Sequence, residues 1–209
     1  MSSRETVLRR IRQATADLPR DPTPTPRSYL RHAPTVAPGD QDGVLALLIE
    51  RLTEYGAEVR RVADADLSAA VAHALTAARS AVAPAGLPDA WLAQWYGLVR
   101  RDAPPLTPAE LDATDAVVTT CAAAIAESGT LVLDGGPGQG RRAPTLLPDL
   151  HVCVVRESQV HSAMPEAIGR LDASRPLTWI SGPSATADIE MIRVQGVHGP
   201  RRLTVLLVP

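Results

Sequence analysis

The sequence contains no lysine, and all 21 of its basic side chains are arginine. Without lysine, the chain cannot form a lysine Schiff base with a carbonyl substrate. It also cannot carry the phosphate-binding loop whose lysine contacts the nucleotide phosphates. Any anion site must therefore use arginine, backbone N–H groups or the amino end of a helix.

Cysteine is also scarce. Cys121 and Cys153 are the only two, and they lie far apart without a CxxC motif. This pattern argues against a disulfide scaffold. An iron–sulfur cluster normally takes four thiolates, so this chain cannot hold one alone. Both cysteines have apolar neighbours in the sequence, which predicts buried small side chains and not nucleophiles.

Long apolar runs are missing as well. None approaches the roughly 20 residues of a membrane span, and residues 1–5 lead into a charged helical pattern instead of a signal core. We therefore expect a cytoplasmic protein. The net charge of −2 and the pI of about 6.2 argue against nucleic acid as the partner, which would need a basic face.

The chain of 209 residues allows one domain with a short appendage. Ser2 and Glu5 have capping-box spacing before an apolar stripe, which predicts an amphipathic helix ending near Pro19. A proline-rich connector follows over residues 19–38. We therefore divide the chain into an N-terminal helix and connector, residues 1–39, and a domain over residues 40–209.

Within this domain, helical and extended patterns alternate. Helices are predicted at 44–55, 67–75, 88–96, 121–127 and 165–171, with a further short helix that begins after Thr107. Strands are predicted at 57–62, 80–83, 115–119, 130–134, 151–156, 177–180, 191–194 and 203–208. This alternation predicts an α/β fold, a three-layer α/β/α sandwich with a mostly parallel sheet. Ligands of such sheets bind beyond the carboxyl ends of the strands.

Glu127 is predicted in the last turn of its helix, where a carboxylate faces the negative end of the helix dipole. This unfavourable placement indicates either a chemical role or a solvated surface side chain.

The segment 135–142 contains four glycines followed by two arginines. Gly136, Gly138 and Gly140 allow close backbone approach, and Arg141 can bind a carboxylate or phosphate as a fork, so we predict an anion-binding loop, with a plain turn as the alternative. A dinucleotide site is rejected because Pro144 and Pro148 leave no room for a crossover helix.

Two further turns are candidates. Ser184 and Asp188 follow a Gly-Pro turn and could contact an anion or simply cap the turn. His198, between glycines, could bind substrate or make a structural hydrogen bond. The other histidines show no metal spacing and are interpreted as structural or solvated, and the tryptophans as core or interface residues; these are His32, His73, His151, His161, Trp91, Trp95 and Trp179.

Four segments in this order, 124–130, 136–148, 182–190 and 196–200, resemble the LUD (lactate-utilisation) domain family, and most closely its lactate-utilisation protein C branch. The resemblance implies a fold similar to that of the ribose-phosphate isomerase and CoA-transferase superfamily. It also implies two iron–sulfur partner proteins that together oxidise L-lactate to pyruvate. The clusters would lie on those partners, with no cofactor or metal on this chain.

Three hypotheses follow. The first is a non-redox subunit that binds a small anionic ligand through Glu127, the glycine loop, Arg141, Ser184, Asp188 and His198. The second is a CoA-transferase-like or ligase-like enzyme, because Glu127-Ser128-Gly129 is similar to the glutamate segment of CoA transferases. The third is a metabolite-sensing regulatory protein. The first is favoured because no redox ligand or nicotinamide motif is found, and direct lactate dehydrogenase activity of the chain alone is expected to be absent.

Overall fold

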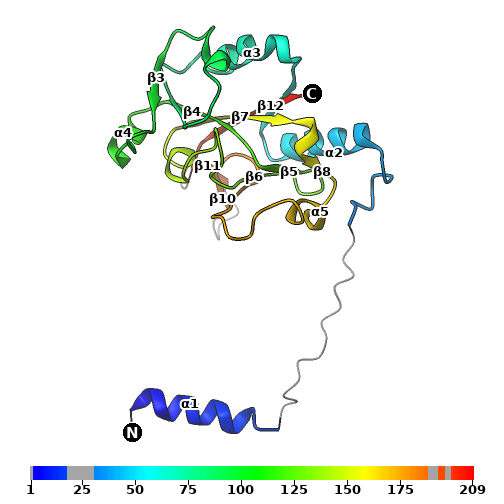
Figure 1. The fold of residues 1–209 in the computed structure, drawn as a ribbon, viewed down its shortest axis with the longest axis vertical. Helices are drawn as coiled ribbons and strands as arrows, with labels where there is room; N and C mark the ends of the chain where they lie inside the picture. The colour runs from blue at the N-terminus through cyan, green and yellow to red at the C-terminus, as the bar shows by residue number, and fades with distance from the viewer. Residues whose placement is uncertain (1, 18–30, 188–192, 196–198) are drawn as a thin grey trace.

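The computed structural model describes residues 2–17, 31–187, 193–195 and 199–209 (Figure 1). Its centre is a six-stranded sheet in which every pairing is parallel. In spatial order the strands are β1 (Glu58–Arg61), β12 (Arg202–Val208), β7 (Leu150–Arg156), β4 (Ala116–Thr120), β2 (Ser80–Ala83) and β3 (Leu98–Arg101). The predicted α/β fold with a mostly parallel sheet is confirmed.

The central strands are buried on both faces. On β7, Leu150, Val152 and Val154 pack in a cluster with α3 (Leu67–Ala74). The alternate residue Val155 packs on the opposite face with α2 (Gln41–Glu54). A strand covered on both sides needs apolar residues at successive positions, which is why these segments are nearly continuous apolar runs.

The helix α2 forms where the sequence pattern predicts it. The Asp40 carboxylate accepts a hydrogen bond from the Gly43 N–H at 2.9 Å and caps the first turn. Leu48 and Leu52 lie on its buried face and are fully covered. Gly56, with a φ of 88°, follows the end of the helix.

A second sheet covers the same face of the central sheet as α2. Its strands, in order, are β8 (Val160–His161), β5 (Ala123–Ile125), β6 (Thr130–Leu133) and β9 (Thr178–Ile180). The short helix α5 (Met164–Ile168) packs against β5. After β9, the chain forms the antiparallel pair β10 (Ala185–Ala187) and β11 (Arg193–Gln195).

The helix predicted over residues 121–127 is wrong. Residues 123–125 form β5, which pairs antiparallel with β6 and parallel with β8. Alanine favours helix in isolation, but this segment is fully buried between two strands. Tertiary pairing therefore decides its conformation.

The helix predicted over residues 88–96 is mostly wrong too. Only a short 3-10 helix, Asp89–Leu92, forms there, and the unpredicted edge strand β3 follows it. The helix predicted after Thr107 is confirmed as α4 (Pro108–Asp112), with its capping box and first-turn proline. The remaining predicted helices and strands are present, with ends shifted by a few residues, except that residues 191 and 192 of the strand predicted over 191–194 lie outside the described residues.

The N-terminal helix α1 (Ser3–Ala14) is confirmed, including the capping box of Ser2 and Glu5. It buries no residue and stands apart from the domain (Figure 1). Most of the predicted connector, residues 18–30, lies outside the described residues, but Ala33 is buried and packs in the core. No helix in the described ranges is both long and apolar enough to cross a membrane.

Truncation of Leu48 tests this core. Leu48→Ala should lower the free energy of unfolding by about 2–5 kcal/mol, because it opens a cavity beside the central sheet. Val7→Ala on α1, where the side chain is 55% exposed, should change it by less than about 0.5 kcal/mol. Urea denaturation of both variants measures the difference, and equal values would contradict this description of the core.

Candidate functional site

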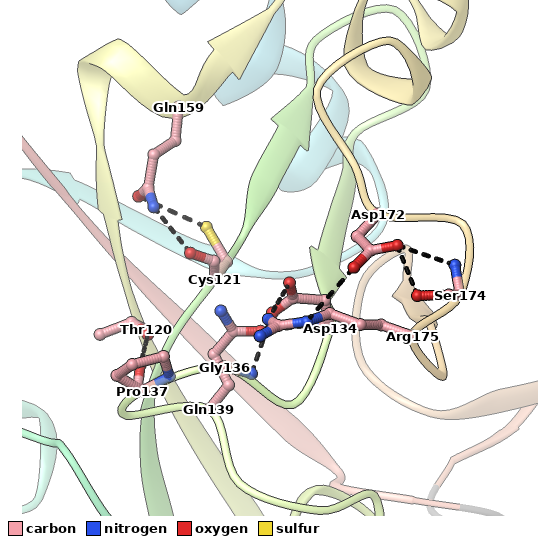
Figure 2. Close-up of polar contacts among 10 residues, drawn as sticks. All are labelled: Thr120, Cys121, Asp134, Gly136, Pro137, Gln139, Gln159, Asp172, Ser174 and Arg175. Carbon is pink, nitrogen blue, oxygen red and sulfur yellow. Dashed lines mark hydrogen bonds and ion pairs between the residues drawn. The ribbon is translucent and has the colours of Figure 1, made fainter.

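The glycine loop, residues 135–140, crosses the carboxyl ends of β2 and β4 (Figure 2). The Gly138 N–H donates to the Ala85 carbonyl at 2.8 Å, and the Thr120 N–H donates to the Gly138 carbonyl at 2.9 Å. The Thr120 hydroxyl donates to the Pro137 carbonyl at 2.9 Å. Because β3 and β4 lie on opposite sides of β2, this is a switch in strand order, where α/β sheets usually bind ligands. Here the loop itself occupies that position.

Asp134 fixes the first half of the loop. Its carboxylate accepts hydrogen bonds from the Gly136 N–H at 2.9 Å and from Arg175 at 2.7 Å (Figure 2). Burial alone would raise the pKa of Asp134, but these hydrogen bonds and the Arg175 charge hold it below its usual value. The N–H groups of Gly136 and Gly138 are thus already used within the protein.

Close packing explains two of the glycines. A Cβ on Gly138, whose φ is 74°, would lie 3.0 Å from Thr120 Cγ2. A Cβ on Gly140, whose φ is 70°, would lie 2.9 Å from Pro84 Cβ. Any larger residue would therefore push the loop off the strand ends.

Arg141 binds a carboxylate as a fork, but that carboxylate belongs to the protein. Its Nε and Nη2 donate to the two Asp102 oxygens at 2.9 and 3.0 Å, and Nη2 also donates to the Leu106 carbonyl at 2.6 Å. The Asp102 side chain is only 5% exposed. Arg141 therefore neutralises a buried charge and ties the loop to the segment before α4.

The next residue, Arg142, lies at a cavity of about 290 Å³ between the central sheet and β9. Its described walls are Arg142, Thr145, Leu146, His151, Thr178, Trp179, Ile180, Ser181, Gly182, Pro183, Ser184, Gly199, Pro200 and Leu203. A second cavity of about 230 Å³ shares Arg142, Thr145 and Thr178 and extends to Gly140 and Arg141. Arg142 thus lines both cavities.

The described part of the cavity lining is positively charged. Among the described residues, neither cavity has an aspartate or glutamate in its lining. Arg141 is neutralised by Asp102, whereas the Arg142 guanidinium makes no ion pair or side-chain hydrogen bond within the described ranges. A cation without a counterion favours an anionic ligand.

His151 is the other ionisable group of the larger cavity. It is 1% exposed, and its Nε2 lies 2.7 Å from the Thr119 hydroxyl. Burial lowers its pKa from 6.5 to about 4, so the ring is neutral at neutral pH. A neutral imidazole has one donor and one acceptor nitrogen, and Nδ1 makes no hydrogen bond with another described residue.

The structure brings together only part of the predicted set. Ser184 lines the larger cavity, and Gly140 and Arg141 line the smaller one. Gly136 and Gly138 serve the loop and line neither. Asp188 and His198 lie outside the described residues.

Glu127 lies in the turn between β5 and β6, where it is exposed, and its N–H donates to the Ser162 carbonyl at 3.0 Å. The helix-dipole argument for Glu127 therefore fails, because there is no helix. The residue does not line the Arg142 cavity.

The cysteines are buried and free, as predicted. A hydrogen bond with the Cys153 thiol, together with burial, raises the pKa of the Cys121 thiol well above its usual value. Gln159 covers Cys121 by donating to its carbonyl at 2.7 Å (Figure 2). Within the described ranges, no group of three or more His, Cys, Asp or Glu side chains could hold a metal ion.

Arg142 and His151 line the cavity but are not among the site residues predicted from the sequence. The sequence does not indicate which of the two adjacent arginines pairs with a carboxylate. That carboxylate, Asp102, lies far from Arg141 in the sequence. His151 had a detectable signal, because it interrupts the apolar run of a strand buried on both faces. A polar ring there needs a partner or a cavity.

The protein has an α/β fold, and a cavity lined by Arg142 lies against its parallel sheet. The LUD domain family matches over residues 106–208. A protein called Lactate utilization protein C from Deinococcus radiodurans is 49% identical over 179 residues, 84% of each chain. Its counterpart in Bacillus pumilus is 42% identical over 92 residues, 40% of this chain and 38% of its own. The chain therefore belongs to the LUD domain family.

The fold agrees with this assignment. A crystal structure of a DUF162 family protein from Deinococcus radiodurans matches with a TM-score of 0.71 and 42% identity. The match covers 82% of this chain and all of that one.

The buried imidazole makes stability depend on pH. The pKa of His151 is about 4 in the folded state and near 6.5 when the chain is unfolded, so the unfolded state binds more protons between these values. The contribution of His151 to the free energy of unfolding is full above about pH 6.5 and should fall by about 3 kcal/mol as the pH drops to 4. Denaturation from pH 4 to 8 measures this. His151→Gln should flatten the dependence, whereas His73→Gln on the exposed face of α3 should leave it unchanged.

Proposed function

We propose that this protein serves L-lactate utilisation as a subunit without a redox centre of its own, and that it binds a small carboxylate anion in the Arg142 cavity. The observation that carries the proposal is the Arg142 guanidinium, which has no counterion within the described ranges and lies at a cavity whose described lining contains no carboxylate. The lactate-utilisation role is supported by the relatives of that name.

The size of the cavity supports a small ligand. Its volume of about 290 Å³ lies at the lower end of the range of small-molecule sites. Leu146, Ile180 and Leu203 provide an apolar wall for a short carbon chain, and Thr178 adds a hydroxyl group. One unpaired cation in a described lining that also carries several hydroxyl side chains suits a small monoanion.

The electron carriers of the proposed reaction are assigned to partners. Oxidation of L-lactate to pyruvate removes two electrons, and the two cysteines of this chain are too few for an iron–sulfur cluster. In the proposal, two iron–sulfur proteins accept the electrons, and this chain holds the carboxylate.

Arg142 and Arg141 form a matched pair for testing the site. Arg142→Ala should weaken binding of L-lactate or pyruvate about 10- to 100-fold, because it removes a charged hydrogen bond, while stability changes by less than about 0.5 kcal/mol. Arg141→Ala leaves Asp102 unpaired and should cost about 1–3 kcal/mol of stability. Calorimetric titration and urea denaturation measure both effects. Equal binding by wild type and Arg142→Ala would contradict the site.

Lactate-dependent dye reduction tests the assembly. The two iron–sulfur partner proteins are titrated with the full chain, and the rate should saturate at a fixed molar ratio. The chain alone should reduce no dye. Activity at trace amounts would indicate a separate enzyme, and a rate independent of the chain would refute the subunit role. Arg142→Ala should saturate at the same ratio but at a lower rate at limiting lactate.

A further inference from the structure

His151 and Arg142 line the same cavity, yet they differ in charge and exposure. Arg142 is an exposed cation, whereas His151 is buried and neutral at neutral pH. Nε2 of His151 is committed to Thr119, so Nδ1 is the nitrogen left for a molecule in the cavity. Arg142 thus offers a cation and His151 a neutral hydrogen-bonding atom in the same cavity.

We infer that the cavity selects a short 2-hydroxy or 2-oxo monocarboxylate, with its carboxylate on Arg142 and its C2 oxygen on His151, oriented by Thr119. This inference rests on the anion binding proposed above and adds the residues that recognise the C2 oxygen of the ligand. His151 is a specificity-determining residue, and Thr119 is a positioning residue that acts through it.

The Thr119 hydroxyl allows both oxidation levels to bind. When it donates to Nε2, Nδ1 carries the ring proton and can donate to a 2-oxo group. When it accepts from Nε2–H, Nδ1 is unprotonated and accepts from a 2-hydroxyl group. The hydroxyl can do either by rotating, so this pair suits the substrate and the product of a 2-hydroxy acid oxidation equally.

The charges of the site argue against other anions. A dicarboxylate needs a second free cation, and the only other one lining either cavity in the described ranges, Arg141, is forked onto Asp102. Phosphate carries more charge and more acceptor oxygens than Arg142 alone can satisfy. A plain carboxylic acid would leave the buried His151 nitrogen without the hydrogen bond that a C2 oxygen provides, which is unfavourable.

Matched ligands test the inference on the full chain. L-Lactate, pyruvate and propionate are titrated calorimetrically, since propionate has the same carbon chain as lactate without the C2 oxygen. Lactate and pyruvate should bind at least about tenfold more tightly than propionate, because one hydrogen bond and the cost of an unpaired nitrogen separate them. Succinate should bind no better than propionate.

Two variants assign the effect to the residues. Thr119→Val keeps the shape of the side chain without the hydroxyl and should reduce the preference for lactate over propionate to about threefold or less. His151→Gln should do the same. Thermal melting identifies any variant that does not fold, and the comparison of ligands on wild type does not depend on it.

The outcomes separate this inference from the proposed function. If lactate and propionate bind equally and Arg142→Ala weakens both, the anion site stands and the selection by His151 is overturned. If none of the acids binds to wild type, both fail. If folded Thr119→Val prefers lactate over propionate as strongly as wild type does, Thr119 does not position His151.

Discussion

The arrangement of the whole site depends on the burial of β7 and β12 on both faces. Helix α3 covers one face, and α2 with the second sheet covers the other. The strands of the second sheet are short, β9 having three residues, so they do not close the face completely. The cavity lies where His151 near the start of β7 and Leu203 near the start of β12 meet β9. It thus lies between the two layers, and the loops at residues 142–146, 181–184 and 199–200 complete its described walls.

The glycine loop explains why the site is not at the usual place. It fills the crevice at the carboxyl ends of β2 and β4 and uses its own N–H groups to do so. Its glycines therefore serve backbone packing against Pro84 and Thr120. The loop still contributes to ligand binding in the proposal, because it ends at Arg142 and fixes where that guanidinium lies.

Residues 44–55 and 151–156 show which parts of the fold could be predicted. The apolar residues of these segments repeat at short, regular intervals, and these intervals predict which side chains are buried. Residues 121–127 could not be predicted, because an alanine-rich segment becomes a strand only through pairing with β6 and β8. The same limit applies to the site. Arg141 and Arg142 are adjacent in sequence, and only the position of Asp102 in space separates a structural arginine from a free one.

The charge of the cavity explains why its histidine is buried. A protonated imidazole in the cavity of the Arg142 guanidinium would add a second cation to a lining that, among the described residues, has no carboxylate, which is unfavourable. Burial lowers the pKa of His151 to about 4, so Arg142 is the one unpaired cation among the described lining residues at neutral pH. A monoanion then neutralises it completely, while the imidazole remains available for a neutral oxygen. The buried position of His151 thus sets both the net charge of the site and the kind of group that Nδ1 can bind.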